Sequence, residues 1–391
     1  MESQYVESRI SRHLHYRAKA AGMPLSGTFE LTPCCNLSCK MCYVRKSMGE
    51  VQTEGGLMSA EEWIELGRKA RDRGMLYLLL TGGEPLSRPD FREIYTALRR
   101  LGLVVSVNTN GTLIDDEMVE FFAADPPSKI NMSLYGSSRE TYKELCGVPE
   151  AFDRAMYAVE KLRSRGITVK INYSVTRYNL PDFDGIFAAA EENGCHVQLA
   201  SYMFPPLRRD ENSVGQNDRL TPEESAAVSL YAEKRRMSEE EYLERCRMRA
   251  EKCGGIDCDE CRDEPSEHIG CRAGSTAFWI NWNGGMSACG MMPLTAANVR
   301  EVGFDAAWAA VRSATQEILL PPKCTACASR DVCMMCAASC YCETGSFSKE
   351  PKYLCRRTEE LIRLSAEEIA KREKTACRRC PKSAYFSKIC S

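Results

Sequence analysis

The chain has 391 residues and a formal net charge of −2, with 52 basic and 54 acidic side chains. This balance argues against a protein that binds nucleic acid by neutralising phosphates. The longest apolar runs fall short of the about 18 residues that a membrane-spanning helix needs. The N-terminus is polar and lacks the apolar segment of a secretory signal. We therefore expect a cytoplasmic protein with no nucleic-acid or membrane partner.

Extended apolar segments alternate with amphipathic helical ones through the first half of the chain. The predicted strands are Thr28–Pro33, Met75–Thr81, Val104–Asn108, Lys129–Leu134, Thr168–Thr176 and Val197–Met203. The predicted helices between them are Ala60–Arg73, Pro89–Arg100, Asp115–Ala124, Phe152–Arg165 and Asp182–Asn193. This alternation is typical of βαβ units around a parallel sheet, either doubly wound or barrel-like. The polar segment 208–250 is predicted to be a helical linker.

Cysteine is unusually frequent, with 22 residues in the chain. A reducing cytosol disfavours structural disulfides, so metal or iron–sulfur ligation is the better interpretation. Four cysteines lie at positions 34–42, and sixteen lie between Cys246 and Cys390. The chain therefore divides into a cysteine-poor middle and a cysteine-rich C-terminal part.

The first group follows the first predicted strand with the spacing Cys35-x3-Cys39-x2-Cys42. Three thiolates can hold three corners of a [4Fe–4S] cluster and leave the fourth iron open to a substrate. A structural zinc site would use four ligands, commonly as two Cys-x2-Cys pairs, and remains the alternative. Cys34 does not belong to this spacing, and we interpret it as a spare thiol that binds no cluster.

This motif, followed by Tyr43, resembles that of the radical S-adenosylmethionine (SAM) enzymes. The resemblance extends to a Gly-Gly-Glu-Pro segment and to the polar ends of the third and fourth strands. It implies SAM contacts from Tyr43, Gly82, Gly83, Glu84, Pro85, Asn108, Asn110 and Ser133. It also implies a partial (β/α)6 TIM-type barrel over roughly residues 26–205. In this family SAM is cleaved reductively to a 5′-deoxyadenosyl radical that abstracts a hydrogen from the substrate. Glu84 is expected to face the ammonium group of SAM, and the two glycines to let the backbone approach it.

The C-terminal cysteines resemble the pattern of a SPASM domain, which holds two auxiliary [4Fe–4S] clusters. By position, the second auxiliary cluster takes Cys324, Cys327, Cys333 and Cys355. The first takes Cys271, Cys289, Cys336 and one upstream cysteine. Cys261 is favoured for that place over Cys253 and Cys258, and Cys340 competes with Cys336. If no upstream cysteine binds, the first auxiliary cluster is the better candidate for substrate contact. The alternative is a pair of zinc ribbons. Cys377, Cys380 and Cys390 fit no pattern, and the aromatic stretch 278–282 is predicted to form a hairpin that packs on a cluster.

These observations predict an α/β fold, in which a partial barrel precedes a small cysteine-rich iron–sulfur domain. The expected parts are an extension (1–25), the barrel (26–207), the linker (208–250), the SPASM domain (251–360), and a C-terminal helix and tail (361–391). The resemblance implies three [4Fe–4S] clusters, SAM, and an electron donor such as flavodoxin or ferredoxin.

The expected substrate is a ribosomally made peptide that receives a thioether or carbon–carbon crosslink or another oxidative modification. A separate leader-binding protein is a possible partner, because only about 25 residues precede the first strand. The alternatives are a formylglycine-forming sulfatase maturase, an enzyme acting on a sugar or amino acid, and a non-catalytic electron carrier. The sulfatase alternative is disfavoured because Gly290 stands where that branch has an aspartate base.

Overall fold

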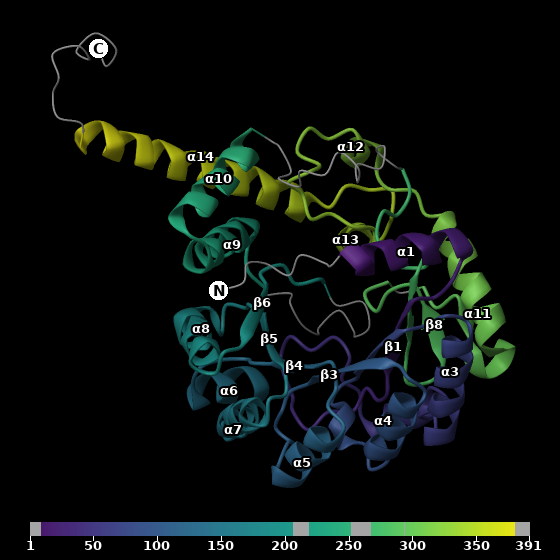
Figure 1. Cartoon of the computed structure of the whole chain (residues 1–391). Helices are drawn as coiled ribbons and strands as arrows, with labels where there is room; N and C mark the ends of the chain where they lie inside the picture. The colour runs from purple at the N-terminus through teal and green to yellow at the C-terminus, as the bar shows by residue number, and fades with distance from the viewer. Residues whose placement is uncertain (1–8, 206–218, 252–266, 293, 380–391) are drawn as a thin grey trace.

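A nine-stranded, mostly parallel sheet forms the centre of the protein. The computed structural model describes residues 9–205, 219–251, 267–292 and 294–379. The strands are β1 (Ser26–Glu30), β2 (Tyr77–Thr81), β3 (Val104–Thr109), β4 (Lys129–Ser133), β5 (Val169–Ser174), β6 (His196–Ala200), β7 (Ala277–Ile280), β8 (Gly285–Ser287) and β9 (Ala297–Asn298). Their order is β6-β5-β4-β3-β2-β1-β7-β8-β9 (Figure 1). The first six strands are parallel, which confirms the predicted α/β partial-barrel fold.

Helices cover the outer face of this sheet. They are α3 (Ala60–Asp72), α4 (Phe91–Arg100), α5 (Asp116–Ala124), α6 (Arg139–Cys146), α7 (Ala151–Ser164), α8 (Phe183–Glu192) and α11 (Val299–Gln316). The first part of the chain also contains α1 (Arg9–Ala21), α2 (Met48–Thr53) and the short 3-10 turns η1 (Pro85–Ser87) and η2 (Leu180–Asp182). In β3, Val105 and Val107 are fully buried in the core shared with the covering helices. Ser106 and Asn108 alternate with them and face the inside of the barrel, because successive strand residues point to opposite faces. The inner wall is therefore polar at β3.

The predicted aromatic hairpin belongs to the main sheet. β7 and β8 pair antiparallel, with Trp279 opposite Ser287. β7 also pairs in parallel with β1, with Ser26 opposite Ala277. Without β7, the edge of β1 would carry unpaired N–H and C=O groups, which strand pairing satisfies. The C-terminal cysteine-rich part is thus joined to the barrel by backbone hydrogen bonds.

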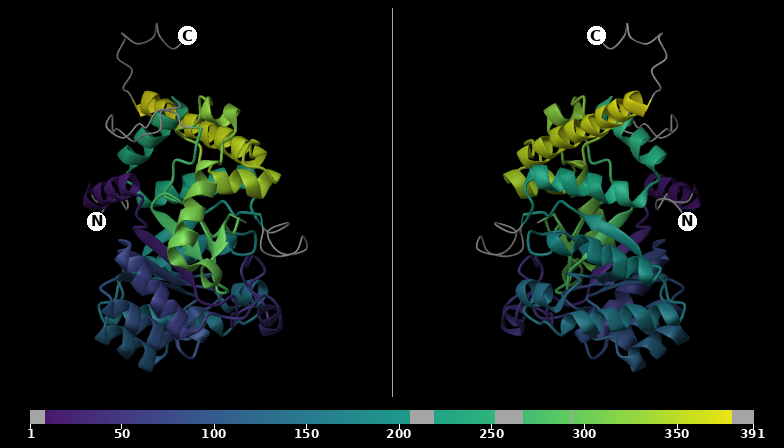
Figure 2. Two further views of the ribbon diagram at one scale, coloured as in Figure 1. Left: turned by 90° about the vertical axis from the view of Figure 1, so that its right-hand side faces the viewer. Right: turned by 90° about the vertical axis from the view of Figure 1, so that its left-hand side faces the viewer.

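The remaining helices form a second layer at the other end of the molecule. They are α9 (Pro222–Arg236), α10 (Glu239–Ala250), α12 (Pro322–Thr325), α13 (Ala337–Thr344) and α14 (Lys352–Arg379). α14 packs against α9 and α10, away from α4 and α5 (Figures 1 and 2). Buried Arg357 of α14 donates hydrogen bonds to the hydroxyls of Ser225 (2.9 Å) and Ser229 (2.7 Å) of α9. The segment predicted as a linker therefore packs as part of the C-terminal layer. None of the helices that the structure describes has the length and apolar character needed to cross a membrane.

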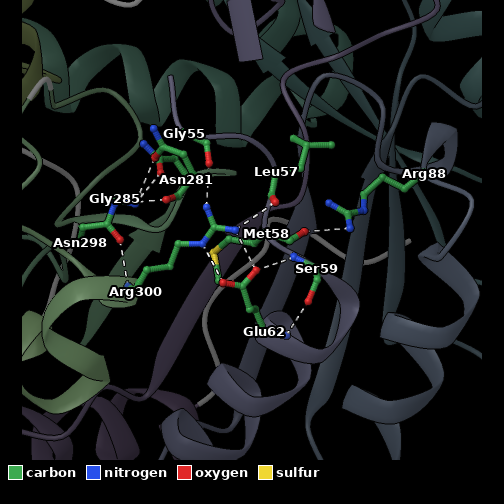
Figure 3. A network of polar contacts seen from close by, with 11 residues as sticks. Gly55, Leu57, Met58, Ser59, Glu62, Arg88, Asn281, Gly285, Asn298 and Arg300 are labelled. Atoms are coloured by element: carbon green, nitrogen blue, oxygen red, sulfur yellow. Dashed lines mark hydrogen bonds and ion pairs between the residues drawn. The ribbon is translucent and has the colours of Figure 1, made fainter. Parts of the chain in front are cut away.

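Arg300 joins the segment between α2 and α3 to the C-terminal part through several polar contacts (Figure 3). Arg300 of α11 makes a two-pronged ion pair with Glu62, with Nε–Oε1 and Nη2–Oε2 distances of 2.7 and 2.8 Å. It also donates to the carbonyl oxygens of Gly55 (3.0 Å) and Leu57 (3.1 Å). From the other side, Arg88 donates to the carbonyl of Met58 at 3.0 Å. These contacts hold the backbone of residues 55–58 in place, between the first cysteine group and α3.

Candidate active site

The Cys35, Cys39 and Cys42 thiols lie in one loop after β1, at the carboxyl end of the parallel strands. Backbone N–H groups point at two of them, because Leu37 N donates to Cys35 Sγ and Arg45 N to Cys42 Sγ, each at 3.4 Å. Burial raises the pKa of the Cys35 thiol to about 12, and the nearby Glu84, Cys39 and Cys42 groups add to this shift. The thiols of Cys39 and Cys42 are therefore close enough to that of Cys35 to affect its pKa. Binding iron requires thiolates, so loading the site releases protons.

The Gly-Gly-Glu segment after β2 packs directly on the backbone of this loop. Gly83 N donates to Thr32 O at 2.6 Å, and Glu84 N donates to Cys34 O at 2.8 Å. A Cβ atom on Gly83 would lie 2.3 Å from the Cys34 carbonyl oxygen, and one on Gly82 would lie 2.4 Å from that of Thr32. The two glycines therefore let the end of β2 approach the cysteine loop closely. Their approach to a ligand stays a prediction.

Cys34 has contacts of its own beside the other three cysteines. Its sulfur lies 3.3 Å from the sulfur of Met48, and its carbonyl oxygen accepts a hydrogen bond from Glu84 N. Its interpretation as a spare thiol stays a prediction.

Glu84 is fully buried and joins the ends of β2 and β3. Its carboxylate accepts hydrogen bonds from Asn110 N (2.7 Å), Thr109 Oγ1 (2.8 Å) and Leu86 N (3.0 Å). Burial raises the pKa of Glu84 to about 7, against the lowering effect of these donors. In this conformation the Glu84 side chain holds the ends of β2 and β3 together through these hydrogen bonds. Its contact with a SAM ammonium group stays a prediction.

Asn110 connects the third strand end to the cysteine loop. Its Nδ2 lies 3.6 Å from Cys35 Sγ and 3.0 Å from Asn36 Oδ1. Its Oδ1 accepts from Thr112 N at 2.9 Å. A residue predicted to contact SAM therefore contacts a predicted cluster ligand. Of the other predicted residues, Pro85 opens the buried η1 turn, and Tyr43 is half-buried beside Cys42.

Amide side chains line the barrel wall beside these residues. Asn131 donates from Nδ2 to Asn108 Oδ1 at 2.8 Å, and Asn172 lies opposite Ser133 in the register of β4 and β5. Within the described ranges, Asn131 Oδ1 and Asn172 Oδ1 are buried acceptors that find no donor in the protein. Unpaired buried acceptors are costly, so they suit a ligand that brings hydroxyl or amino donors. SAM carries such donors in its ribose, adenine and amino groups.

Sequence reasoning missed Asn131 and Asn172. The available signal was their placement in strands: both are polar residues two positions from other polar inward residues, Ser133 and Ser174. Strand periodicity puts such residues on one face. It does not reveal that their amide oxygens lack donors, because that depends on packing between strands.

Several C-terminal cysteines share one buried cluster with Tyr202, which follows β6; they are Cys289, Cys324, Cys333, Cys336 and Cys340. Burial raises the pKa of Cys324 to about 11, and the neighbouring thiols of Cys355, Cys333 and Cys327 add to the rise. These four are the set predicted for the second auxiliary cluster. In the other predicted set, Cys336 adds to the burial that raises the pKa of Cys271.

Several predicted or uncertain cysteines cannot be placed in either set. Cys253, Cys258, Cys261, Cys380 and Cys390 lie outside the described residues, and the side chain of Cys377 is not described either.

The cysteines available as ligands are not joined in disulfides in the described part of the chain. Nowhere in that part do three or more Cys, His, Asp or Glu side chains converge tightly enough to chelate one metal ion. In a [4Fe–4S] cube each thiolate binds a different iron, so its ligands stand further apart than those of a single ion. An iron–sulfur cluster in the Cys35–Cys42 loop, with zinc as the alternative, stays a prediction from the sequence.

Comparison with known proteins gives a family for the barrel. Residues 29–189 match the model of the Radical SAM superfamily. An AdoMet-dependent heme synthase of Methanosarcina barkeri (strain Fusaro / DSM 804) is 28% identical over 341 residues, which cover 84% of this chain and 95% of that protein.

Two solved structures share the fold at low sequence identity. Streptococcus suis SuiB bound to the precursor peptide SuiA has a TM-score of 0.60 at 19% identity and covers 91% of this chain and 84% of its own. The anSMEcpe protein with bound AdoMet and the Cp18Cys peptide has a TM-score of 0.67 at 17% identity and covers 90% and 99%.

Proposed function

Because the chain is an enzyme with a Radical SAM superfamily domain over residues 29–189, we propose that it uses SAM to modify a peptide oxidatively. The observation that supports this most directly is the convergence at one sheet edge. Three thiols and the Gly-Gly-Glu segment lie at the carboxyl ends of β1 and β2, and the unpaired amide acceptors of Asn131 and Asn172 lie on the barrel wall within β4 and β5. When bound, the cluster and SAM supply a 5′-deoxyadenosyl radical that abstracts a substrate hydrogen.

The residues of the chain have distinct tasks in this proposal. Cys35, Cys39 and Cys42 hold the cluster, and Asn110 donates a hydrogen bond to the first of them. Asn131 and Asn172 accept hydrogen bonds from SAM or substrate with their free amide oxygens. The buried carboxylate of Glu84 keeps the strand ends in place. The protein thus binds, orients and excludes water, while the cofactors carry the radical chemistry.

A peptide substrate is supported by the fold that the chain shares with two peptide-bound proteins, SuiB and anSMEcpe. The sulfatase-maturase alternative is weakened by packing around Gly290. A Cβ atom there would lie 2.8 Å from the Trp279 ring, too close for any side chain without movement. An aspartate base could not be placed at this position with Trp279 where it is.

A second candidate function is an AdoMet-dependent heme synthesis. It is favoured by the relative of that name, because the likeness extends over both the barrel and the C-terminal part. This reaction would use a small molecule and no peptide.

One experiment separates the two candidates. The anaerobically reconstituted protein is incubated with SAM and a reductant, together with either short peptides encoded nearby or a panel of iron porphyrins. Peptide-dependent 5′-deoxyadenosine and a peptide mass change are the expected results. Heme formation without peptide modification would overturn the peptide proposal and support the second candidate. Zinc bound in stoichiometric amount, without sulfide, would refute both.

A further inference from the structure

The first auxiliary cluster has three predicted ligands and lacks an assigned fourth. We propose that Cys342 is this fourth ligand and completes the set with Cys271, Cys289 and Cys336. The inference rests on the proposed function, because it assumes that the C-terminal part holds auxiliary clusters. The cysteine pattern assigned no role to Cys342.

Cys342 and Cys289 flank the same residue. Cys342 Sγ lies 3.5 Å from the carbonyl oxygen of Met291, and Met291 N donates to Cys289 Sγ at 3.4 Å. The two cysteines are 53 positions apart in the sequence. Their sulfurs nevertheless contact the same residue, one at the carbonyl oxygen of Met291 and the other at its backbone N–H. The Cys289 loop and helix α13 are therefore held side by side at the sulfurs.

Helix α13 also brings Cys336 to this place. Cys336 is its N-cap residue, and its sulfur accepts a hydrogen bond from Ser339 N at 3.4 Å. Burial raises the pKa of Cys342 to about 12, and the nearby Cys336, Glu343 and Cys289 groups add to the rise. The sulfur of Cys342 thus lies near two of the three predicted members of the set.

The geometry of α13 separates Cys342 from Cys340. Residues two apart on an α-helix point about 200° apart around its axis. Cys340 is fully buried, and its neighbouring thiols are Cys324, Cys336 and Cys333, two of which belong to the second set. The helix therefore presents Cys342 to the first set and Cys340 to the second.

A buried network fixes the rotation of α13. Glu343, next to Cys342, accepts two hydrogen bonds from Arg219 at 2.7 and 3.2 Å and one from the Tyr202 hydroxyl at 2.9 Å. Its side chain is only 9% exposed. Tyr202 follows β6, at the same sheet edge where the Cys35–Cys42 loop follows β1. The network therefore holds this cysteine set toward the cluster end of the barrel.

The functional consequence concerns the open iron. Four cysteine ligands leave a [4Fe–4S] cluster without a free coordination position. The first auxiliary cluster then suits electron transfer and cannot ligate a substrate thiolate, in contrast to our expectation for a three-ligand set.

The test is the iron and sulfide content of Cys342→Ser protein after anaerobic reconstitution. We expect a loss of about four iron and four sulfide, roughly one third of the content of a three-cluster protein. The EPR signal of the SAM cluster, including its change on adding SAM, should persist. Cys195→Ser is the matched control, since Cys195 is half-buried beside β6, far along the sheet from β7.

The outcomes separate this inference from the proposed function. Wild-type protein with only about four iron would overturn both the auxiliary clusters and the role of Cys342. About twelve iron in wild type and in Cys342→Ser would overturn the role of Cys342 alone, as would loss of a cluster in Cys261→Ser but not in Cys342→Ser.

If the serine variant does not fold, alkylation of wild-type protein gives the answer. We expect Cys342 to resist iodoacetamide in the loaded protein and to react after the iron is removed, as read by peptide mass mapping. Equal labelling in both states would refute ligation.

Discussion

Asn110 Nδ2 lies 3.6 Å from the sulfur of Cys35, although the two residues come from different strand ends. Hydrogen bonds to ligand sulfurs are among the factors that set the potential of an iron–sulfur cluster. Asn110 is thus placed to influence the electronics of the predicted SAM cluster.

Asn110→Ala should make the potential of this cluster more negative, because the lost hydrogen bond stabilises the more negative, reduced state. An EPR-monitored redox titration measures the change. Asn283→Ala serves as control, since Asn283 is half-buried in the turn between β7 and β8 and donates to the Glu54 carbonyl. An unchanged or raised potential in Asn110→Ala would contradict the assignment.

Joint replacement of Cys35, Cys39 and Cys42 by alanine should remove about four iron and four sulfide per chain and abolish SAM cleavage. Cys34→Ala should keep its full iron content, because that sulfur contacts Met48. Iron analysis and 5′-deoxyadenosine formation are the measurements. Iron loss in Cys34→Ala would show that the loop rearranges on loading.

Glu84→Gln should weaken SAM binding on the order of tenfold to a hundredfold, the effect of losing one charge-assisted hydrogen bond. The amide also loses one acceptor for Asn110 N, Thr109 Oγ1 or Leu86 N. Equilibrium binding and thermal unfolding together distinguish direct contact from bracing. Weaker binding with unchanged unfolding indicates contact, and a parallel loss of both indicates bracing. Normal SAM affinity would rule out a role in binding.

Arg300→Met should lower the free energy of unfolding by about 1–3 kcal/mol, because it removes an ion pair and two bonds to carbonyl oxygens. Arg73→Met is the matched control. Arg73 also joins α3 to α11, through Asp305, but both side chains are more than half exposed, so we expect about 0–1 kcal/mol. Denaturant unfolding measures both. Equal losses would mean that the carbonyl contacts add nothing.

Lys170 should make stability rise with pH in the alkaline range. Burial, helped by Lys129, lowers the pKa of Lys170 to about 8 from an ordinary value of 10.5. Between these values the unfolded chain binds the proton and the folded chain does not, so stability attributable to this site increases as pH rises from about 8 to 10.5. The difference in unfolding temperature between wild type and Lys170→Met should shift in favour of wild type over this range. A difference that does not depend on pH would contradict the shifted pKa.

Much of the fold and part of the candidate site could be predicted from local sequence patterns. The six parallel strands and five of the helices follow from apolar periodicity and capping residues such as Ser59, whose side chain accepts from Glu62 N. The cysteine spacing is also local, so the Cys35–Cys42 loop could be identified from the sequence. Helices α1, α2, α6, α11, α12 and α13 were missed; among them α2 and α6 are short, with six and eight residues.

By itself, the sequence determined which segments become strands and helices and which cysteines lie in one loop, because both depend on neighbours along the chain. Tertiary structure decided the contacts between distant segments. It paired β7 with β1 about 250 residues away, set Gly82 and Gly83 against the cysteine loop, and brought the Cys342 sulfur to the Met291 carbonyl. Such contacts depend on how whole helices and strands pack. The hydrophobic periodicity of a segment does not tell which other segment its edge or face will contact.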